Sequence, residues 1–470
     1  MSLIKNLHQK LIKKEVSAVD LVNQSFKLIE EKDKDLKAFI TLTKEEAFKE
    51  AEKVDKKISQ GEEIDLISGL PFALKDNILT KGIKTTAASK ILADYYGSYD
   101  ATVFKKLKEK GAILIGKTNL DEFAMGSSTE NSAFFTTKNP YDLDRVAGGS
   151  SGGSAVAVSS SMAVFALGSD TGGSIREPAA FCGVVGFKPS YGSVSRYGLI
   201  PMASSLDVIG PITKTVEDAR IIFETIAGKD EFDATSFDLK KEKNSKKEII
   251  IGLDEEFLAE GVAEEIKEKF LSVIKKIEEF GLKIKNIDLT LNPYALSCYY
   301  IIMPAEVSAN LARYDGLRYS SLKDTNFKNL EDIYFKNRGL GFGKEVRRRI
   351  LLGTYVLSHG YYDAYYRKAQ KVRRLIKEEY EKQFQQVDFI ISPTTPTLPF
   401  KIGEKISDPL AMYLSDIFTV GANIAGLPAI NLPIGFSKSN LPIGLQITAP
   451  YKKDFDLLDF SQQIEKLVNF

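Results

Sequence analysis

Two glycine- and serine-rich segments carry the residue types best suited to covalent chemistry. GGSSGGSAVAV spans residues 148–158, and GSDTGGSIREPAAFCGVVGFKP spans residues 168–189. In the second segment Ser174 follows Gly172 and Gly173, and glycines allow consecutive backbone N–H groups to converge on one point. Such a cluster of donors can stabilise the oxyanion that forms when a nucleophile attacks a carbonyl group. The pattern therefore favours Ser174 as a nucleophile.

A flexible linker is the alternative explanation for residues 148–158, because Gly and Ser are also the usual linker residues. The segment continues directly into SAVAVSSSMAVFALGSD, residues 154–170, which is apolar enough to lie in a core. We therefore interpret both glycine-rich segments as parts of a folded site.

A serine nucleophile needs a base, and histidine is a poor candidate in this chain. Only His8 and His359 are present, and no G-x-S-x-G motif is expected in the strand–turn–helix context of a Ser-His-Asp hydrolase. The two histidines share no helix face, so we expect no metal site. The base is then a carboxylate, a lysine, or a hydroxyl that relays the proton to one of these.

Lys75 is a candidate for this base. It ends the apolar part of GLPFALKDN, residues 69–77, and burial there would disfavour the charged form and lower the pKa of the lysine. The alternative is a lysine whose ammonium group extends from a strand end into solvent. The segment alone leaves both interpretations open.

Composition and charge exclude several classes of protein. The chain has 64 basic and 63 acidic residues, a net charge of +1, which argues against non-specific nucleic-acid binding as its main activity. Cys182 and Cys298 form no metal-binding or disulfide pattern and fit a reducing cytoplasm. Residues 1–22 read as a charged amphipathic helix rather than a signal peptide. Residues 155–167 are too short to span a bilayer, so we expect a soluble cytoplasmic protein.

Helical and strand patterns alternate along the 470 residues without a repeat period, which predicts a single α/β domain. We divide it into a helical N-terminal part (1–65), a core with both glycine-rich segments (66–228), a polar surface insertion (229–247) and the remaining sheet and helices (248–470).

Shorter patterns predict individual elements. Ser17 with Asp20, and Thr43 with Glu46, have the spacing of helix N-terminal capping pairs, and Gly61 is expected to end the second helix. Buried strands are expected at 111–116, 184–187, 248–253 and 387–393, and a helix at 264–280 ending at Gly281.

One motif is rejected. GAILIGKT, residues 111–118, satisfies the P-loop pattern G-x-x-x-x-G-K-[ST] and would place Lys117 on a phosphate. Its four intervening residues are all apolar, and no clear helix follows, so the segment is better explained as a buried strand.

The two glycine-rich segments, together with LPFALKDN (residues 70–77), resemble the amidase signature family, including the 24-residue spacing between Ser150 and Ser174. This resemblance implies a large central mixed sheet covered by helices on both faces. It also implies a Ser–cis-Ser–Lys triad that cleaves amides.

Carried over to this sequence, the resemblance makes Ser174 the nucleophile, Ser150 the bridging serine on a cis peptide bond, and Lys75 the base. The oxyanion hole would use the backbone of Thr171, Gly172 and Gly173, with the N–H of the nucleophile itself.

Other residues of these segments lie outside the triad. Asp170 and Arg176 flank the nucleophile, and we interpret them as structural partners that hold its loop. Ala147 and Gly421 depart from the family pattern, where prolines are expected, but neither departure removes a catalytic group.

Four further segments, residues 195–219, 312–319, 345–373 and 408–433, are similar to one branch of that family, the A subunits of bacterial tRNA-dependent amidotransferases. The similarity implies hydrolysis of glutamine and transfer of the ammonia to a B subunit. That B subunit would bind ATP, magnesium and most of the misacylated tRNA, and a C subunit would complete a heterotrimer. No cofactor is expected in this chain, and the choice between Glu-tRNA(Gln), Asp-tRNA(Asn) or both stays open.

Glutamine carries an α-carboxylate and an α-ammonium group, so its site needs a fixed cation and a fixed anion. Arg349 in VRRRI and Asp416 in MYLSD match the branch's substrate-binding positions, with Tyr300 a third candidate. A guanidinium suits a carboxylate because it binds through two donors. Without the resemblance, three consecutive arginines would indicate a solvated helix face, and the adjacent Arg348 remains an alternative to Arg349.

Two rival functions share these residues. A free-standing amidase for small amides would have the same triad and a different pocket. A non-catalytic scaffold of a tRNA-modifying complex would not require intact Ser174, Ser150 and Lys75.

Overall fold

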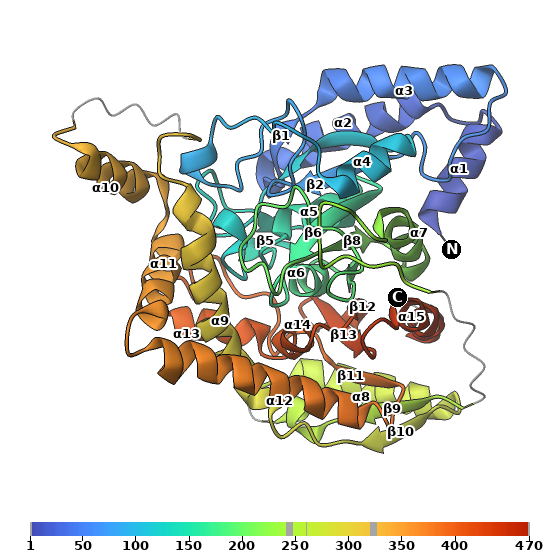
Figure 1. Cartoon of the computed structure of the whole chain (residues 1–470). Coiled ribbons are helices and arrows are strands. Elements are labelled where there is room, and N and C mark those ends of the chain that lie inside the picture. The colour runs from blue at the N-terminus through green and yellow to red at the C-terminus, as the bar shows by residue number, and fades with distance from the viewer. Residues whose placement is uncertain (1, 241–247, 260, 320–326, 469–470) are drawn as a thin grey trace.

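The computed structural model describes residues 2–240, 248–259, 261–319 and 327–468. Eleven strands of these residues form one sheet through the middle of the protein (Figure 1). They are β1 (Phe39–Leu42), β2 (Pro71–Lys75), β3 (Ile113–Thr118), β6 (Phe165–Asp170), β7 (Val185–Lys188), β8 (Val208–Thr213), β9 (Ile250–Leu253), β10 (Lys283–Asn286), β11 (Phe389–Pro393), β12 (Ala429–Phe436) and β13 (Pro442–Thr448). A separate hairpin is formed by β4 (Lys138–Asn139) and β5 (Asp142–Val146).

The sheet is mixed. Its order is β1-β3-β2-β6-β8-β7-β12-β13-β11-β9-β10, with parallel pairs such as β2–β6 and antiparallel pairs such as β6–β8. Every residue of β2, β3, β6, β8 and β13 is buried. Strands that are apolar on both sides are typical of a sheet covered by helices on both faces. The predicted fold class is thereby confirmed.

The helices form three groups. The N-terminal group comprises α1 (Leu3–Ile12), α2 (Ala18–Leu36), α3 (Lys44–Ser59) and α4 (Thr102–Glu109). Two sets pack on the central strands: α5 (Gly152–Ser159) with α6 (Arg176–Phe181), and α7 (Val216–Ile226) with α8 (Glu264–Glu279) and α15 (Asp454–Val468). The third group lies beyond the sheet: α9 (Ala295–Asn310), α10 (Leu330–Gly341), α11 (Lys344–Leu357), α12 (Lys368–Gln383), α13 (Pro409–Tyr413), the 3₁₀ turn η7 (Leu414–Asp416) and α14 (Val420–Ala425).

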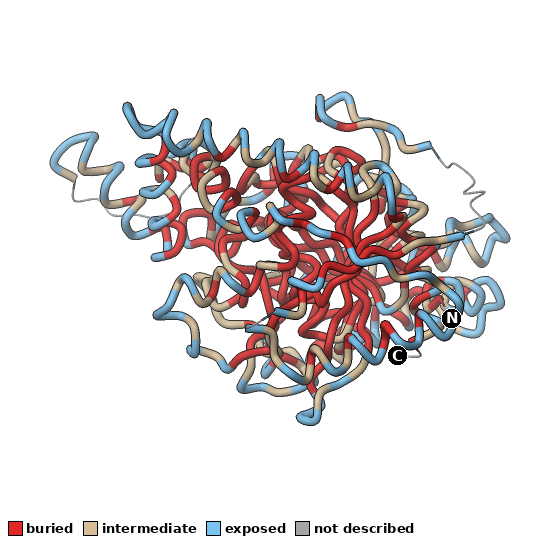
Figure 2. Tube along the Cα trace, turned by 90° about the horizontal axis from the view of Figure 1, so that it is seen from below, coloured by how far each residue is buried: buried red, intermediate tan, exposed pale blue. Residues whose placement is uncertain are grey.

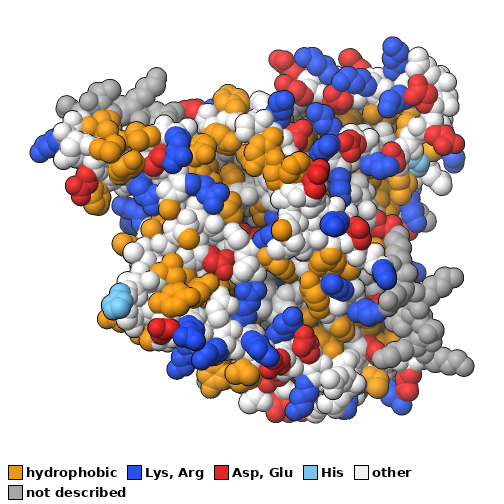
Figure 3. All heavy atoms as spheres, viewed as in Figure 1, with side chains coloured by type: hydrophobic (Ala, Val, Ile, Leu, Met, Phe, Trp, Pro, Cys, Tyr) orange, Lys and Arg blue, Asp and Glu red, His pale blue; other side chains and the backbone are white. Residues whose placement is uncertain are grey.

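The third group gives the protein an uneven outline. Helix α9 packs on both α11 and α12, and α10 projects from this group (Figure 1). Buried residues concentrate in the centre of the molecule (Figure 2), while Lys and Arg alternate with Asp and Glu over the face shown in Figure 3. The helical layer at the side and the sheet at the centre therefore meet along one boundary, and the candidate site lies there.

Most of the predicted elements are present. The strands expected at 111–116, 184–187, 248–253 and 387–393 correspond to β3, β7, β9 and β11, and the helix at 264–280 corresponds to α8. The single N-terminal helix expected over residues 1–22 is wrong, because α1 ends at Ile12 and α2 begins at Ala18. Ser17 and Asp20 cause this restart: they form a full capping box, which starts a helix by satisfying its free N–H groups.

The second capping pair behaves differently. Thr43 does precede α3, but its hydroxyl donates to the carbonyl oxygen of Leu114 at 2.7 Å instead of capping the helix. The helix itself ends near the expected Gly61, which has a φ of +74°. Of the expected insertion at 229–247, residues 241–247 lie outside the described residues, and this boundary stays a prediction.

Candidate active site

Lys75 is the last residue of β2, and its side chain is fully buried. Its Nζ lies 2.7 Å from Ser150 Oγ, 2.7 Å from Ser151 Oγ and 3.1 Å from the carbonyl oxygen of Ser169. Burial lowers the pKa of Lys75 to about 7, although nearby carboxylates, Asp121 first among them, favour its charged form. The solvent-exposed alternative is therefore wrong, and a neutral lysine is accessible near neutral pH.

Ser150 lies in the turn that connects β5 to α5, and the Gly149–Ser150 peptide bond is cis. The turn packs too closely for a side chain at Gly149, where a Cβ would lie 2.2 Å from Asp121 Oδ2. Residues 148–152 also read G-x-S-x-G and follow a strand and precede a helix, contrary to the expectation for this motif. The side chain bonded to Ser150 Oγ is nevertheless Lys75.

Ser174 lies in the turn between β6 and α6. Gly173 has a φ of +153°, and a Cβ there would lie 2.3 Å from Thr419 Oγ1, so the turn requires glycine. The carbonyl oxygen of Ser174 accepts a hydrogen bond from the N–H of Ser151 at 3.1 Å, which joins the two glycine-rich turns directly.

The three triad candidates differ in exposure. Ser174 is 6% exposed, whereas Ser150 and Lys75 are 0% exposed. The hydroxyl of Ser174 makes no hydrogen bond within the described residues, while that of Ser150 is held by Lys75. The outermost of the three is thus the residue expected to attack.

The predicted support of the nucleophile's turn is present. Asp170 and Arg176 form a fully buried salt bridge of 3.1 Å, and Asp170 also accepts the N–H of Ile175. Burial would raise the pKa of Asp170, but the adjacent Arg176 holds it at about 2. Arg176 extends the connection to the carbonyl oxygen of Thr419, at 2.9 Å.

The expected oxyanion-hole residues are held by side chains from other elements. Thr171 Oγ1 donates to Asp207 at 2.7 Å, and Thr419 Oγ1 donates to the carbonyl oxygen of Gly172 at 2.6 Å. These contacts restrain the hydroxyl group of Thr171 and the carbonyl group of Gly172.

Arg349, Tyr300 and Asp416 come from α11, α9 and η7. The Arg349 side chain is 3% exposed and that of Arg348 is 42% exposed, which favours Arg349 as the recognition residue. Its guanidinium carbon lies 5.5 Å from the Tyr300 ring centre and 5.6 Å from that of Tyr413, and these two rings stack 3.9 Å apart.

Asp416 connects this region to the nucleophile's turn. Its Oδ1 is 3.1 Å from where a Gly173 Cβ would lie, and its Oδ2 accepts from Ser127 Oγ at 2.9 Å. Burial raises the pKa of Asp416 to about 7. A cation bound against this carboxylate would therefore sit beside the nucleophile.

A cavity of about 310 Å³ opens in this region. It is lined by Gly126, Ser128, Glu130, Asn131, Lys344, Glu345, Arg348, Arg349, Lys405, Ile406, Ser407, Pro409, Met412 and Tyr413. The cavity places the buried cation Arg349 at its wall, and its volume suits a small polar ligand.

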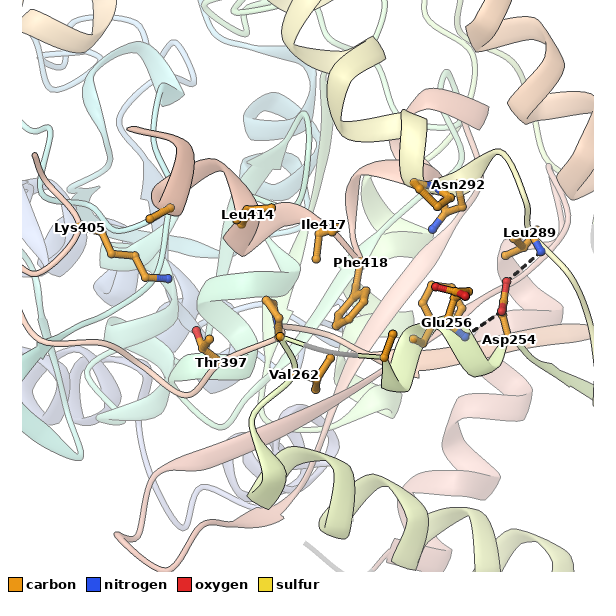
Figure 4. Close-up of a pocket in the computed structure, with 16 residues that line it drawn as sticks. Asp254, Glu256, Val262, Leu289, Asn292, Thr397, Lys405, Leu414, Ile417 and Phe418 are labelled. Carbon is orange, nitrogen blue, oxygen red and sulfur yellow. Dashed lines mark hydrogen bonds between the residues drawn. The ribbon is translucent and has the colours of Figure 1, made fainter. Parts of the chain in front are cut away.

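A second cavity, of about 450 Å³, lies beside η7 (Figure 4). Leu414, Ile417 and Phe418 form part of its mainly apolar wall, and the carboxylate of Asp254 is occupied by the N–H groups of Glu256 and Leu289. Neither cavity is lined by Lys75, Ser150 or Ser174, but the smaller one is lined by Arg349, so we associate substrate binding with the smaller cavity.

The sequence profile of the Amidase family matches residues 20–458. The chain belongs to the amidase signature family. Its relatives include the A subunit of the glutamyl-tRNA(Gln) amidotransferase from Picosynechococcus sp., 52% identical over 99% of this chain and 98% of the relative. The corresponding protein from Geobacillus thermodenitrificans is 54% identical over 96% of this chain and 94% of its own length.

Solved structures agree. The crystal structure of the glutamyl-tRNA(Gln) amidotransferase A subunit from Thermotoga maritima has a TM-score of 0.79 and 46% identity, over 96% of this chain and 91% of that one. A crystal structure described as an amidase has a TM-score of 0.84 and 29% identity, over 99% of both chains. The protein is accordingly an amide-hydrolysing enzyme. Among the described helices, none has the length and apolar character needed to cross a membrane.

The segment that matches the P-loop pattern, residues 111–118, contains the strand β3, as expected. Lys117 is fully buried and lies 3.4 Å from Asp76, and it donates to the carbonyl oxygen of Ile78 at 2.7 Å. Because the ammonium group of Lys117 is buried and bonded to acceptors of the protein, it is not available to bind a phosphate group.

Several residues of the amidase site were missed in the sequence. Ser151 shares Lys75 with Ser150, and Ser127 holds Asp416, but neither has a sequence signal that separates it from the many other serines. Glu345 pairs with Arg349 at 2.8 Å, and the i,i+4 spacing within a helix was a usable signal for that contact.

Proposed function

We propose that this amidase is the glutaminase subunit of a tRNA-dependent amidotransferase. It would supply ammonia for converting Glu-tRNA(Gln) to Gln-tRNA(Gln), with Asp-tRNA(Asn) as a second candidate substrate of the complex. The observation that carries the proposal is that the site contains both a buried cation, Arg349, and a buried carboxyl, Asp416, and that Asp416 lies next to the turn of Ser174. The names of the relatives that match over nearly the whole chain support it.

The proposed reaction begins with proton transfer along Lys75 and the two serines. Neutral Lys75 accepts the proton of Ser150 Oγ, to which it is already hydrogen-bonded, while Ser150 accepts that of Ser174. Ser174 Oγ then attacks the side-chain carbonyl carbon of glutamine. Ammonia leaves with a proton returned through the same groups, and water hydrolyses the acyl-enzyme to release glutamate and free Ser174.

The oxyanion of each tetrahedral intermediate is assigned to the backbone N–H groups of Thr171, Gly172, Gly173 and Ser174. Hydrogen bonds of this kind are most effective when they are fixed before charge develops. The contacts of Thr171 with Asp207, and of Gly172 with Thr419, support such a preorganised turn.

The substrate would be held by its amino-acid end. Arg349 would bind the α-carboxylate, the ionised Asp416 would bind the α-ammonium group, and Tyr300 would pack beside them. Asp416 lies next to Gly173, so a ligand anchored there presents its side-chain amide close to the nucleophile. Propionamide has neither charged group and would gain nothing from this half of the site.

Further subunits complete the proposal. A B subunit would bind ATP and magnesium and the misacylated tRNA, and a C subunit would join the other two in a cytoplasmic heterotrimer. No cofactor is assigned to this chain. Co-purification of the three proteins would support this part of the proposal, and a stable lone chain in cells that express all three would contradict it.

Two measurements test the glutaminase assignment: the turnover of glutamine compared with that of propionamide, and the covalent labelling of Ser174. We expect kcat/KM for glutamine to exceed that for propionamide by at least about 10²-fold, since two charge-assisted contacts are absent for propionamide. The glutamine-mimicking electrophile 6-diazo-5-oxo-L-norleucine should add to Ser174, as measured by intact and peptide mass spectrometry.

The controls are matched serine variants. Ser174→Ala should abolish both the adduct and turnover, whereas Ser272→Ala, on the exposed side of α8, should change neither. Preference for propionamide would favour a free-standing amidase, and the absence of both turnover and adduct in the assembled complex would favour a scaffold.

A further inference from the structure

Glu345 is the closest charged neighbour of Arg349, and it faces the same cavity. We propose that Glu345 is a positioning residue that orients Arg349 for the α-carboxylate of the substrate, and so sets the preference for amino-acid amides over simple amides. This inference rests on the glutaminase function proposed above.

The contacts of Glu345 fix the guanidinium group from one side. Its Oε1 accepts a hydrogen bond from Arg349 Nε at 2.8 Å and a second from Tyr413 Oη at 2.9 Å. Its Oε2 accepts from Arg348, whose side chain is the more exposed of the two arginines. A single carboxylate therefore joins the recognition arginine, an aromatic ring of the cavity and the cavity's outer cation.

The hydrogen bond to Nε leaves most of the guanidinium free. Arginine has five N–H donors, and Glu345 uses only the one on Nε. Nη1 approaches Met303 Sδ at 3.5 Å, which is a weak acceptor, and within the described residues no hydrogen bond holds Nη2. The terminal nitrogens are thus available for two parallel hydrogen bonds to a carboxylate.

Aromatic packing restricts the same group in the other direction. The guanidinium lies within 5.6 Å of the ring centres of both Tyr300 and Tyr413, and the Tyr413 hydroxyl is tied to Glu345. Glu345 therefore fixes both the arginine and one of the rings that it packs against. Without Glu345, a guanidinium with several rotatable bonds would lose the acceptor that defines its orientation.

A purely structural salt bridge is the competing explanation, since Glu345 and Arg349 are buried and four residues apart on α11. The two explanations differ in what they predict for substrate choice. A structural role affects all substrates through folding, whereas a positioning role affects only substrates that carry the carboxylate.

The test compares Glu345→Ala with Glu345→Gln on glutamine and on propionamide. For Glu345→Ala we expect KM for glutamine to rise at least about tenfold, the effect of losing a charge-assisted hydrogen bond. We expect kcat for glutamine within about threefold, and kcat/KM for propionamide within about twofold, of the unaltered enzyme, because the triad is untouched. Glu345→Gln keeps an oxygen acceptor for Nε, so KM should return to within about threefold of the unaltered value.

Two further variants complete the design. Tyr413→Phe removes only the second donor to Glu345 and should raise KM for glutamine by about threefold to fivefold, even if Glu345→Ala proves unstable. Glu378→Ala is the matched control, because Glu378 pairs with Arg374 at the same i,i+4 separation on exposed α12 and should alter nothing.

The results separate this inference from the function on which it rests. If the unaltered enzyme hydrolyses glutamine and Glu345→Ala leaves its KM unchanged, or weakens both substrates equally, the positioning role is overturned and the glutaminase stands. Failure of Glu345→Gln to restore KM would also overturn it. If the unaltered enzyme does not act on glutamine at all, the proposed function fails first.

Discussion

The two halves of the site are built from different material. The proposed catalytic half consists of strand ends and tight turns, in which Lys75, Ser150 and Ser174 are held by backbone contacts and by glycines that admit no side chain. The binding half consists of side chains from α9, α11, α13 and η7, and those of the first three contact one another through hydrogen bonds and stacked rings. The first is fixed by close packing of the chain itself, and the second by interactions that single substitutions can alter.

This difference suggests how one fold can serve several amides. A bacterial aryl acylamidase structure of the same family has a TM-score of 0.85 at only 25% identity. Backbone-built turns can persist at such divergence, whereas a pocket of paired side chains changes when a few residues change. We infer that substrate choice in this enzyme resides in α9, α11, α13 and η7.

The largest effect should come from the catalytic half. Lys75→Met removes the base and should lower kcat by about 10³-fold or more for glutamine and propionamide alike. Stopped assays of ammonia release would measure it. Lys117→Met is the matched control, because it removes an equally buried lysine from the adjacent strand and should lower thermal stability while leaving kcat within about tenfold. If Lys75→Met lowered kcat for glutamine only, Lys75 would act in substrate binding, and the distinction between the two halves would be wrong.

The next largest effect should be a difference between the two substrates in the pH dependence of kcat/KM. Burial lowers the pKa of Lys75 and raises that of Asp416, each to about 7. Lys75 acts when neutral and Asp416 when ionised, so both contributions are lost as the pH falls through about 7. Between pH 6 and pH 5, kcat/KM should fall about tenfold for propionamide and up to about a hundredfold for glutamine. Identical slopes for the two substrates would show that Asp416 takes no part in binding.

A smaller effect is expected from the binding half alone. Asp416→Asn keeps the oxygen that can accept from Ser127 but loses the charge that would face the α-ammonium group. KM for glutamine should rise about 10- to 50-fold, with propionamide unchanged within about twofold. Initial-rate kinetics would measure both values, and Asp408→Asn, at the exposed start of α13, provides the control. Equal losses for the two substrates would mean that Asp416 supports the nucleophile's turn instead.

The catalytic half was the easier one to predict from the sequence. Its two serines lie in short, glycine-rich segments that can be recognised from the sequence alone. Lys75 ends a strand with a clear apolar pattern. The α/β class followed from the alternation of helical and strand patterns along the chain, and the mixed sheet from the resemblance of these segments to the family. The break between α1 and α2 was obscured by continuous amphipathic spacing, although the capping box of Ser17 and Asp20 was visible.

Most contacts of the binding half could not be predicted from the sequence. Ser127 and Asp416 are far apart in sequence, and nothing local to either indicates that they meet. The same is true of Thr419 and Gly172, which are joined by a hydrogen bond across the boundary between the two halves. Such pairings depend on how the helical layer docks on the sheet, and no periodicity in the sequence encodes that docking.

The hydrogen bond between Ser151 N–H and the carbonyl oxygen of Ser174 has a consequence for how this gene can change. It closes α5 and β6 into a loop of fixed length, whose two ends must meet at the site. Within residues 151–174 only Ser161 is exposed, at the turn between helix and strand. Insertions and deletions should therefore be confined to that turn, because elsewhere in the segment a change of a single codon in length would displace Ser174 from Ser151 and from the adjacent Ser150.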